Sequence, residues 1–107
     1  NVQVTRTELK DYKAKKFIGS NRTKTLAYEI AIKNNKTTSI NLIVEDQYPI
    51  SQNSEIEVEV LENGNAKVDD RKGLLTWKDT IPANGSQKHS FAYTVKYPKN
   101  ETITNVQ

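Results

Sequence analysis

The stretch Leu26-Ala27-Tyr28-Glu29-Ile30-Ala31-Ile32-Lys33 alternates large apolar side chains with small or charged ones. Because successive side chains of a β-strand point to opposite faces, this period of two predicts a strand with one face on a core and the other in water. The same alternation returns at 40–44, 56–60 and 91–97. Buried parallel strands are instead continuous apolar runs, so the pattern favours antiparallel sheets.

Residues that favour turns separate these runs, and they include Pro49, Gly64, Gly73 and the stretch 82–86. No segment has a helical period. We predict an all-β fold, an antiparallel immunoglobulin-like β-sandwich of about seven strands. The expected strands lie near residues 2–9, 25–33, 39–46, 55–62, 74–79 and 87–97, with a weaker one near 66–69.

The bulk composition supports a single domain. The chain has 107 residues, of which 35% are hydrophobic, and this suits a thin core between two sheets. There is no cysteine, so disulfides and thiolate metal sites are excluded. No stretch approaches the ~20 apolar residues of a membrane span. We predict one β-sandwich domain over residues 1–107. Since the chain begins with Asn1, we expect it to be a trimmed fragment or a processed chain of a longer protein.

Charge is distributed unevenly, although the net charge of +3 is too small to indicate a nucleic-acid partner. Residues 10–24 hold six basic residues against Asp11, a local charge of +5, whereas residues 45–62 hold six acidic residues and no basic one. We interpret both segments as solvated surface, with contact to an anionic polymer as the alternative for the basic one. Residues 10–24 are expected to form an extended crossing or a bulged strand with Phe17 against the rim of the sandwich. Residues 98–107 are expected to form a tail or a short strand through Ile103.

The candidate binding site is the segment Asp46-Gln47-Tyr48-Pro49 at the end of the strand near 39–46. Loops at the end of a sandwich commonly carry binding, and here an acceptor carboxylate stands beside a flat amphipathic ring. The structural alternative is that Asp46 and Gln47 satisfy backbone donors where the strand ends, while Pro49 fixes the turn.

Other candidates for chemistry are weaker. Trp77 is a possible sugar platform, but it shares the parity of Leu75, which favours a core position. Alternating glutamates along a strand lie too far apart for one calcium ion, so we predict no metal site. His89 is the only histidine, and we expect Ser90 to lie on the opposite face with no carboxylate placed to orient the ring. The acidic residues considered for calcium are Glu55, Glu57, Glu59, Glu62, Asp69 and Asp70.

Several short stretches occur together in a pattern that resembles a known family. They are residues 16–21, 28–36, 44–51, 56–58, 73–77 and 93–99, of which Val44-Glu45-Asp46-Gln47-Tyr48-Pro49-Ile50-Ser51 is the most specific. The chain resembles the C-terminal domain of unknown function of the mucoidy-inhibitor A (MuiA) family of bacterial exported proteins. This resemblance implies a location in the periplasm or cell envelope and a Gram-negative source. It provides no catalytic residue to carry over.

Taken together, these features predict a non-catalytic structural or interaction module of a bacterial envelope protein, and not an enzyme. Its expected partners are other domains of its parent chain or envelope proteins, and we predict no cofactor. A carbohydrate-binding module that contacts glycans is the alternative, based on Trp77 and five tyrosines. A fragment of a hydrolase is the third hypothesis, since a catalytic domain could precede this one.

Overall fold

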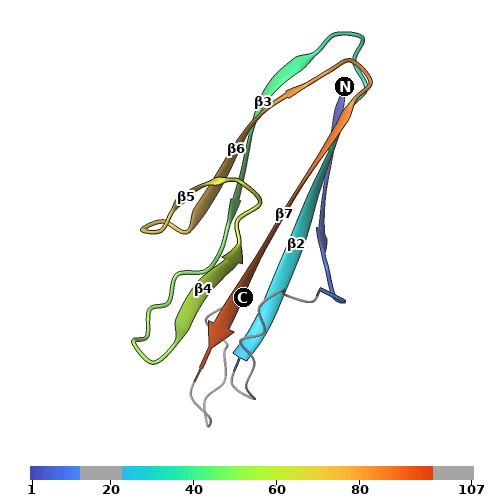
Figure 1. Ribbon diagram of the computed structural model, residues 1–107. Helices are drawn as coiled ribbons and strands as arrows, with labels where there is room; N and C mark the ends of the chain where they lie inside the picture. Colours follow the sequence, from blue (N-terminus) through green and yellow to red (C-terminus); the bar gives the residue numbers. More distant parts are fainter. Residues whose placement is uncertain (13–22, 98–107) are drawn as a thin grey trace.

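The computed structural model describes residues 1–12 and 23–97, and every regular element in that part is a β-strand (Figure 1). The predicted strands are all present, including the weak one. The expectations for Phe17 and for residues 98–107 lie outside the described residues. The strands are β1 (Val2–Glu8), β2 (Thr23–Asn34), β3 (Ile40–Gln47), β4 (Glu57–Glu62), β5 (Lys67–Asp69), β6 (Leu74–Ile81) and β7 (Ser86–Lys96).

The strands form two antiparallel sheets, which confirms the predicted sandwich. One sheet has the order β1-β2-β7-β4 and the other the order β3-β6-β5. In an immunoglobulin constant-type domain the fifth strand lies between the second and the fourth, and the seventh lies beside the sixth. Here β7 and β5 exchange those two places. The exchange preserves strand directions, so every neighbouring pair is still antiparallel.

The centre of the larger sheet is the long pair β2 and β7, whose register runs from Thr23 opposite Lys96 to Lys33 opposite Ser86. These two strands provide most of the fully buried side chains. A shift of one residue would turn the apolar set toward water, and the core therefore fixes this register. The buried apolar residues of the pair are Leu26, Ala27, Ile30, Ile32, Phe91, Ala92, Tyr93 and Val95.

The smaller sheet covers this surface with the inward side chains of β6. Leu75 and Ile81 are fully buried, and Trp77 is only 4% exposed. The indole Nε1 of Trp77 donates a hydrogen bond of 2.8 Å to the carbonyl oxygen of Gly64. Trp77 is therefore a core residue, as its parity predicted, and its ring face is not available as an open platform.

Each side of the sandwich is bridged by a polar side-chain pair between the sheets. On the first side, Arg6 of the edge strand β1 contacts Asp46 of the edge strand β3. On the other side, β4 and β5 are short, so residues 77–81 of β6 and 86–91 of β7 have no strand beside them there within the described chain. In that gap His89 of β7 contacts Asp79 of β6.

Asn34, the last residue of β2, is fully buried. It connects the loop between β2 and β3 with the loop between β6 and β7, both at the top of Figure 1. Its side-chain Nδ2 donates to the carbonyl oxygens of Thr38, Ile81 and Pro82 at 3.0, 3.1 and 3.0 Å. Its Oδ1 accepts from the backbone nitrogen of Lys36 at 3.0 Å. One amide thus joins the loop after β2 to the loop after β6, which holds the two sheets together at this end.

Replacement of Asn34 by Asp tests this clamp with almost no change of shape. At neutral pH a carboxylate would face three carbonyl oxygens in a buried position, so we expect the free energy of unfolding to fall by roughly 3 kcal/mol or more. Urea denaturation measures the loss. The neighbouring exposed Asn35 provides the control: Asn35→Asp should change stability by less than about 0.5 kcal/mol. Equal effects of the two changes would contradict the clamp.

Candidate functional site

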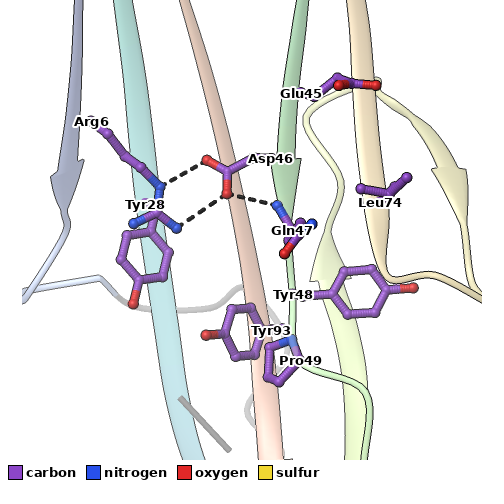
Figure 2. Close-up of a pocket in the computed structure, with 9 residues that line it drawn as sticks. All are labelled: Arg6, Tyr28, Glu45, Asp46, Gln47, Tyr48, Pro49, Leu74 and Tyr93. Carbon is purple, nitrogen blue, oxygen red and sulfur yellow. Dashed lines mark hydrogen bonds and ion pairs between the residues drawn. The ribbon is translucent and has the colours of Figure 1, made fainter.

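The predicted segment Asp46–Pro49 lines a cavity of about 740 Å³ on the side of the sandwich where β1 faces β3. Figure 2 shows that this cavity also receives side chains from β1, β2 and β7. The structure therefore brings all four predicted residues to one place and adds the neighbouring Glu45 and four residues that are distant in sequence. The added residues are Arg6, Tyr28, Glu45, Leu74 and Tyr93.

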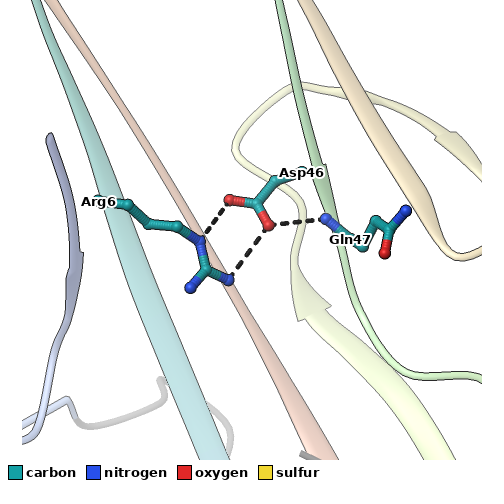
Figure 3. A network of polar contacts seen from close by, with 3 residues as sticks. All are labelled: Arg6, Asp46 and Gln47. Atoms are coloured by element: carbon teal, nitrogen blue, oxygen red, sulfur yellow. Dashed lines mark hydrogen bonds and ion pairs between the residues drawn. The ribbon is translucent and has the colours of Figure 1, made fainter. Parts of the chain in front are cut away.

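The charged centre of the cavity is the pair Arg6 and Asp46 (Figure 3). Arg6 donates from Nε to Asp46 Oδ2 at 2.8 Å and from Nη2 to Asp46 Oδ1 at 3.2 Å, a two-point contact that fixes both planes. The same Oδ1 accepts from the backbone nitrogen of Gln47 at 2.7 Å. The hydrogen bond to Asp46 raises the pKa of Arg6, although burial opposes this.

The exposure of the two partners differs, because the side chain of Asp46 is 11% exposed and that of Arg6 is 48% exposed. The guanidinium carbon of Arg6 lies 4.0 Å from the centre of the Tyr28 ring, in a cation–π position. Asp46 is therefore fixed in the wall, while Arg6 lies over an aromatic ring with half of its surface open to solvent. An incoming carboxylate or carbonyl group could contact that open half.

Three tyrosines form the floor of the cavity. The ring of Tyr93 lies 6.4 Å from that of Tyr28 and 6.5 Å from that of Tyr48, measured between ring centres. Tyr93 is buried, and burial followed by the neighbouring Tyr28 raises its pKa well above the ordinary value. The floor of the cavity is therefore aromatic, with the buried Tyr93 at its centre.

The loop after β3 is anchored through Tyr48. Its hydroxyl donates to Asp70 Oδ1 at 2.9 Å, and its backbone nitrogen donates to the carbonyl oxygen of Gly73 at 2.9 Å. Gly73 has a φ of +66°, and a Cβ there would lie 2.4 Å from the carbonyl oxygen of Tyr48. Only glycine suits this position, so the turn before β6 holds Asp46–Pro49 in place.

The alternative interpretation of the segment Asp46–Pro49, in which its polar side chains satisfy backbone donors at the strand end, also agrees with contacts in the structure. Asp46 accepts the Gln47 backbone donor at the end of β3, as expected for a residue that satisfies a strand end. It also binds Arg6 across the sheets, which that alternative did not include. One signal for Arg6 exists in the sequence. It has the inward parity of Val4 in β1 and is therefore a charged residue on the apolar face of a strand.

The expectation that no carboxylate orients His89 is wrong. Asp79 Oδ2 lies 2.6 Å from His89 Nε2, and the two side chains are 7% and 10% exposed. The residues lie on strands of different sheets, and alternation assigns a face to each residue without pairing positions across the core. Asp79 has the inward parity of Trp77, a signal that could have identified it. Ser90 lies on the face opposite His89, as predicted.

The remaining predicted positions form no further site in the described residues. Glu57 and Glu59 of β4 are exposed. Within residues 1–12 and 23–97, no group of three or more His, Asp or Glu side chains is placed to hold a metal ion. No helix in that part of the chain has the length and apolarity needed to cross a membrane.

Comparison with known families identifies the domain. A family model described as "Domain of unknown function (DUF4139)" matches residues 1–99. The chain belongs to this family. No curated protein and no solved structure matches the chain. The expectation of a domain of unknown function is confirmed, and the DUF4139 domain described here is an antiparallel sandwich whose conspicuous cavity lies between two edge strands.

Burial and the hydrogen bond to Asp70 raise the pKa of Tyr48 from about 10 to about 12. The folded state therefore holds the phenol proton more tightly than the unfolded state. The resulting stability is fully present below pH 10 and is lost as the pH rises toward 12. We expect the free energy of unfolding to fall across this window, and less steeply in Tyr48→Phe, as measured by urea denaturation at each pH. An equally steep fall in the variant would show that other groups cause it.

Proposed function

We propose that this domain is a non-catalytic interaction module that binds an extended polypeptide segment along the free edge of β3, beside the cavity lined by Asp46–Pro49. A segment of this kind adds a strand to a sheet edge, where main-chain hydrogen bonds provide affinity and nearby pockets provide specificity. The finer assignment also belongs to this proposal. In it, the domain is part of a MuiA-like exported protein of the bacterial cell envelope, and its partner is a neighbouring domain or another envelope protein.

The observation that carries the proposal is the position of the exposed apolar side chains. Three large hydrophobic residues are exposed in the described chain: Val4 at 60%, Ile43 at 63% and Ile50 at 42%. Val4 lies on β1, Ile43 on β3, and Ile50 in the loop that leaves β3. Val4 and Ile43 therefore lie on the two edge strands that border the cavity, with Ile43 on the outer face of its sheet opposite Lys78. A large apolar side chain exposed on an edge strand is typical of a surface that another molecule covers.

The edge strand β4 of the larger sheet and the edge strand β3 of the smaller sheet differ in a way that supports this choice. The edge strand β4 carries exposed glutamates at Glu57 and Glu59, and charges of this kind protect an edge from strand addition. On β3 the exposed face carries Asn41, Ile43 and Glu45, so a large apolar side chain is exposed at the middle of the strand beside one glutamate. β3 spans eight residues and pairs only with β6 in the described chain, so its other edge presents unpaired main-chain groups.

The cavity adds a means of recognition to this edge. A side chain from the bound segment would meet the ring of Tyr28, the half-exposed guanidinium of Arg6 and the tyrosine floor. Tyrosine and arginine are the residue types that most often dominate binding energy in protein interfaces. The carbohydrate-binding alternative has less support, because its main residue, Trp77, is 4% exposed.

Site-specific photo-cross-linking tests the proposal in the natural protein in its host cells. A photoreactive residue at position 43 should cross-link to one defined peptide segment, which mass spectrometry of the product locates. The same residue at position 59, an exposed site on the edge strand β4, is the matched control and should give at most a weak, scattered reaction. Equal yields at positions 43 and 59 would contradict the proposal, as would hydrolase activity of the purified domain.

A further inference from the structure

Val4 points toward the interior of the sandwich, although most of its surface is in solvent. It lies opposite Ile32, which is 1% exposed, and residues that face each other in a strand pair share one face of the sheet. Val4 is therefore on the core face of the larger sheet. That sheet has four strands and the smaller sheet has three, so the described chain has no fourth strand to complete the cover over β1.

The edge strands β1 and β3 can be aligned through their one ion pair. Arg6 contacts Asp46, and Figure 1 shows the two strands running in the same direction. Val4 lies two residues before Arg6, and the inward-facing Val44 lies two residues before Asp46. Val4 and Val44 are therefore at the same height along the sandwich. In a strand added to the free edge of β3, the residue opposite Val44 would point into the gap beside Val4.

The outer face of β3 sets a second requirement. Ile43 and Glu45 point outward, with Lys78 and Thr76 of β6 opposite them on one side and no strand on the other side within the described chain. The carboxylate of Glu45 is exposed and has no ion-pair or hydrogen-bond partner among the described residues. Opposite charges and apolar pairs that face each other across two strands are stabilising. A basic residue opposite Glu45 and an apolar residue opposite Ile43 would therefore complement this face.

The other open side of the sandwich lacks these features. A second cavity, of about 570 Å³, lies there, and its lining includes the core-facing residues Trp77, Asp79 and His89. None of the three large hydrophobic residues that are exposed in the described chain lines it. Only on the side of β1 and β3 would an added strand cover exposed apolar side chains with both of its faces.

We propose that the segment bound along β3 carries apolar side chains opposite Ile43 and Val44 and a basic side chain opposite Glu45. The middle one of these three residues packs on Val4 between the sheets, and the other two lie on the outer face. Because successive residues of a strand point to opposite faces, one strand covers both Val4 and Ile43. This inference rests on the proposed function and specifies the sequence of the partner.

Selection of random peptides of strand length, displayed on phage, against the 107-residue chain tests the basic residue. Enriched peptides should carry lysine or arginine two positions from an apolar residue, with a second apolar residue between them. Glu45→Lys should reverse this preference to an acidic residue and weaken the binding of a basic peptide roughly fivefold. Glu59→Lys changes an exposed glutamate of the edge strand β4 and should keep the basic preference.

Two different failures are distinguishable in this selection. Enriched peptides that protect β3 but show no basic preference, or the same preference with Glu45→Lys, overturn the inference and leave strand addition intact. No enriched peptide at all would contradict strand addition itself.

Val4→Asn decides whether the segment also enters the gap between the sheets. The affinity of an enriched peptide, measured by calorimetry, should fall about fivefold or more, because the added strand would bury an amide without a partner. Thr5→Asn places the same amide on the exposed outer face of β1, opposite Ala31, and should leave the affinity unchanged. Equal affinities of the two variants overturn this placement. An unchanged indole resonance of Trp77 in each free variant shows that the fold is intact.

Discussion

The pairing of β2 with β7 is the constraint on which the rest of the structure depends. Eleven consecutive positions face each other from Thr23–Lys96 to Lys33–Ser86, and they supply most of the core. Once this register is fixed, the inward faces of both strands are fixed too, because a shift of one residue would exchange core and solvent. The smaller sheet has only three strands to cover a four-stranded one, so the sandwich is closed along its centre and left open along its sides. Both cavities occur at these open sides.

Polar pairs bridge these sides because full apolar closure is not available there. An ion pair that reaches solvent contributes little to stability, on the order of 0–1 kcal/mol. Arg6 with Asp46, where the arginine is half exposed, therefore stabilises the fold less than it defines the shape and charge of the first cavity. Stability comes from the core and from Asn34, whose amide joins two loops at one end of the sheets.

The sequence predicted the strands well because alternation is a local property. Residues 26–33 contain enough of it to define a strand without any knowledge of its neighbours. It also predicted that the strand near 39–46 ends at the segment Asp46–Pro49, since proline cannot continue the ladder. It did not predict partners across the sheets: Arg6 lies 40 positions from Asp46, and alternation assigns faces without pairing them. Nor did it predict the exchange of β5 and β7, because both strand orders bury the same faces. The sequence did contain one indication of these pairs across the sheets: a charged residue, such as Asp79, at a position that alternation assigns to the apolar face of a strand.

The central functional claim is that the free edge of β3 is covered by another polypeptide segment in the natural assembly. Amide hydrogen exchange along β3 and β4 measures this most directly, when it is recorded for the 107-residue chain alone and for the natural protein in its assembly. A strand added to β3 would slow the exchange of those main-chain amides of Ile40–Gln47 that point away from β6. The exchange of the amides of Glu57–Glu62 in β4 would stay unchanged. Unchanged exchange along β3, or new protection confined to β4, would contradict the account.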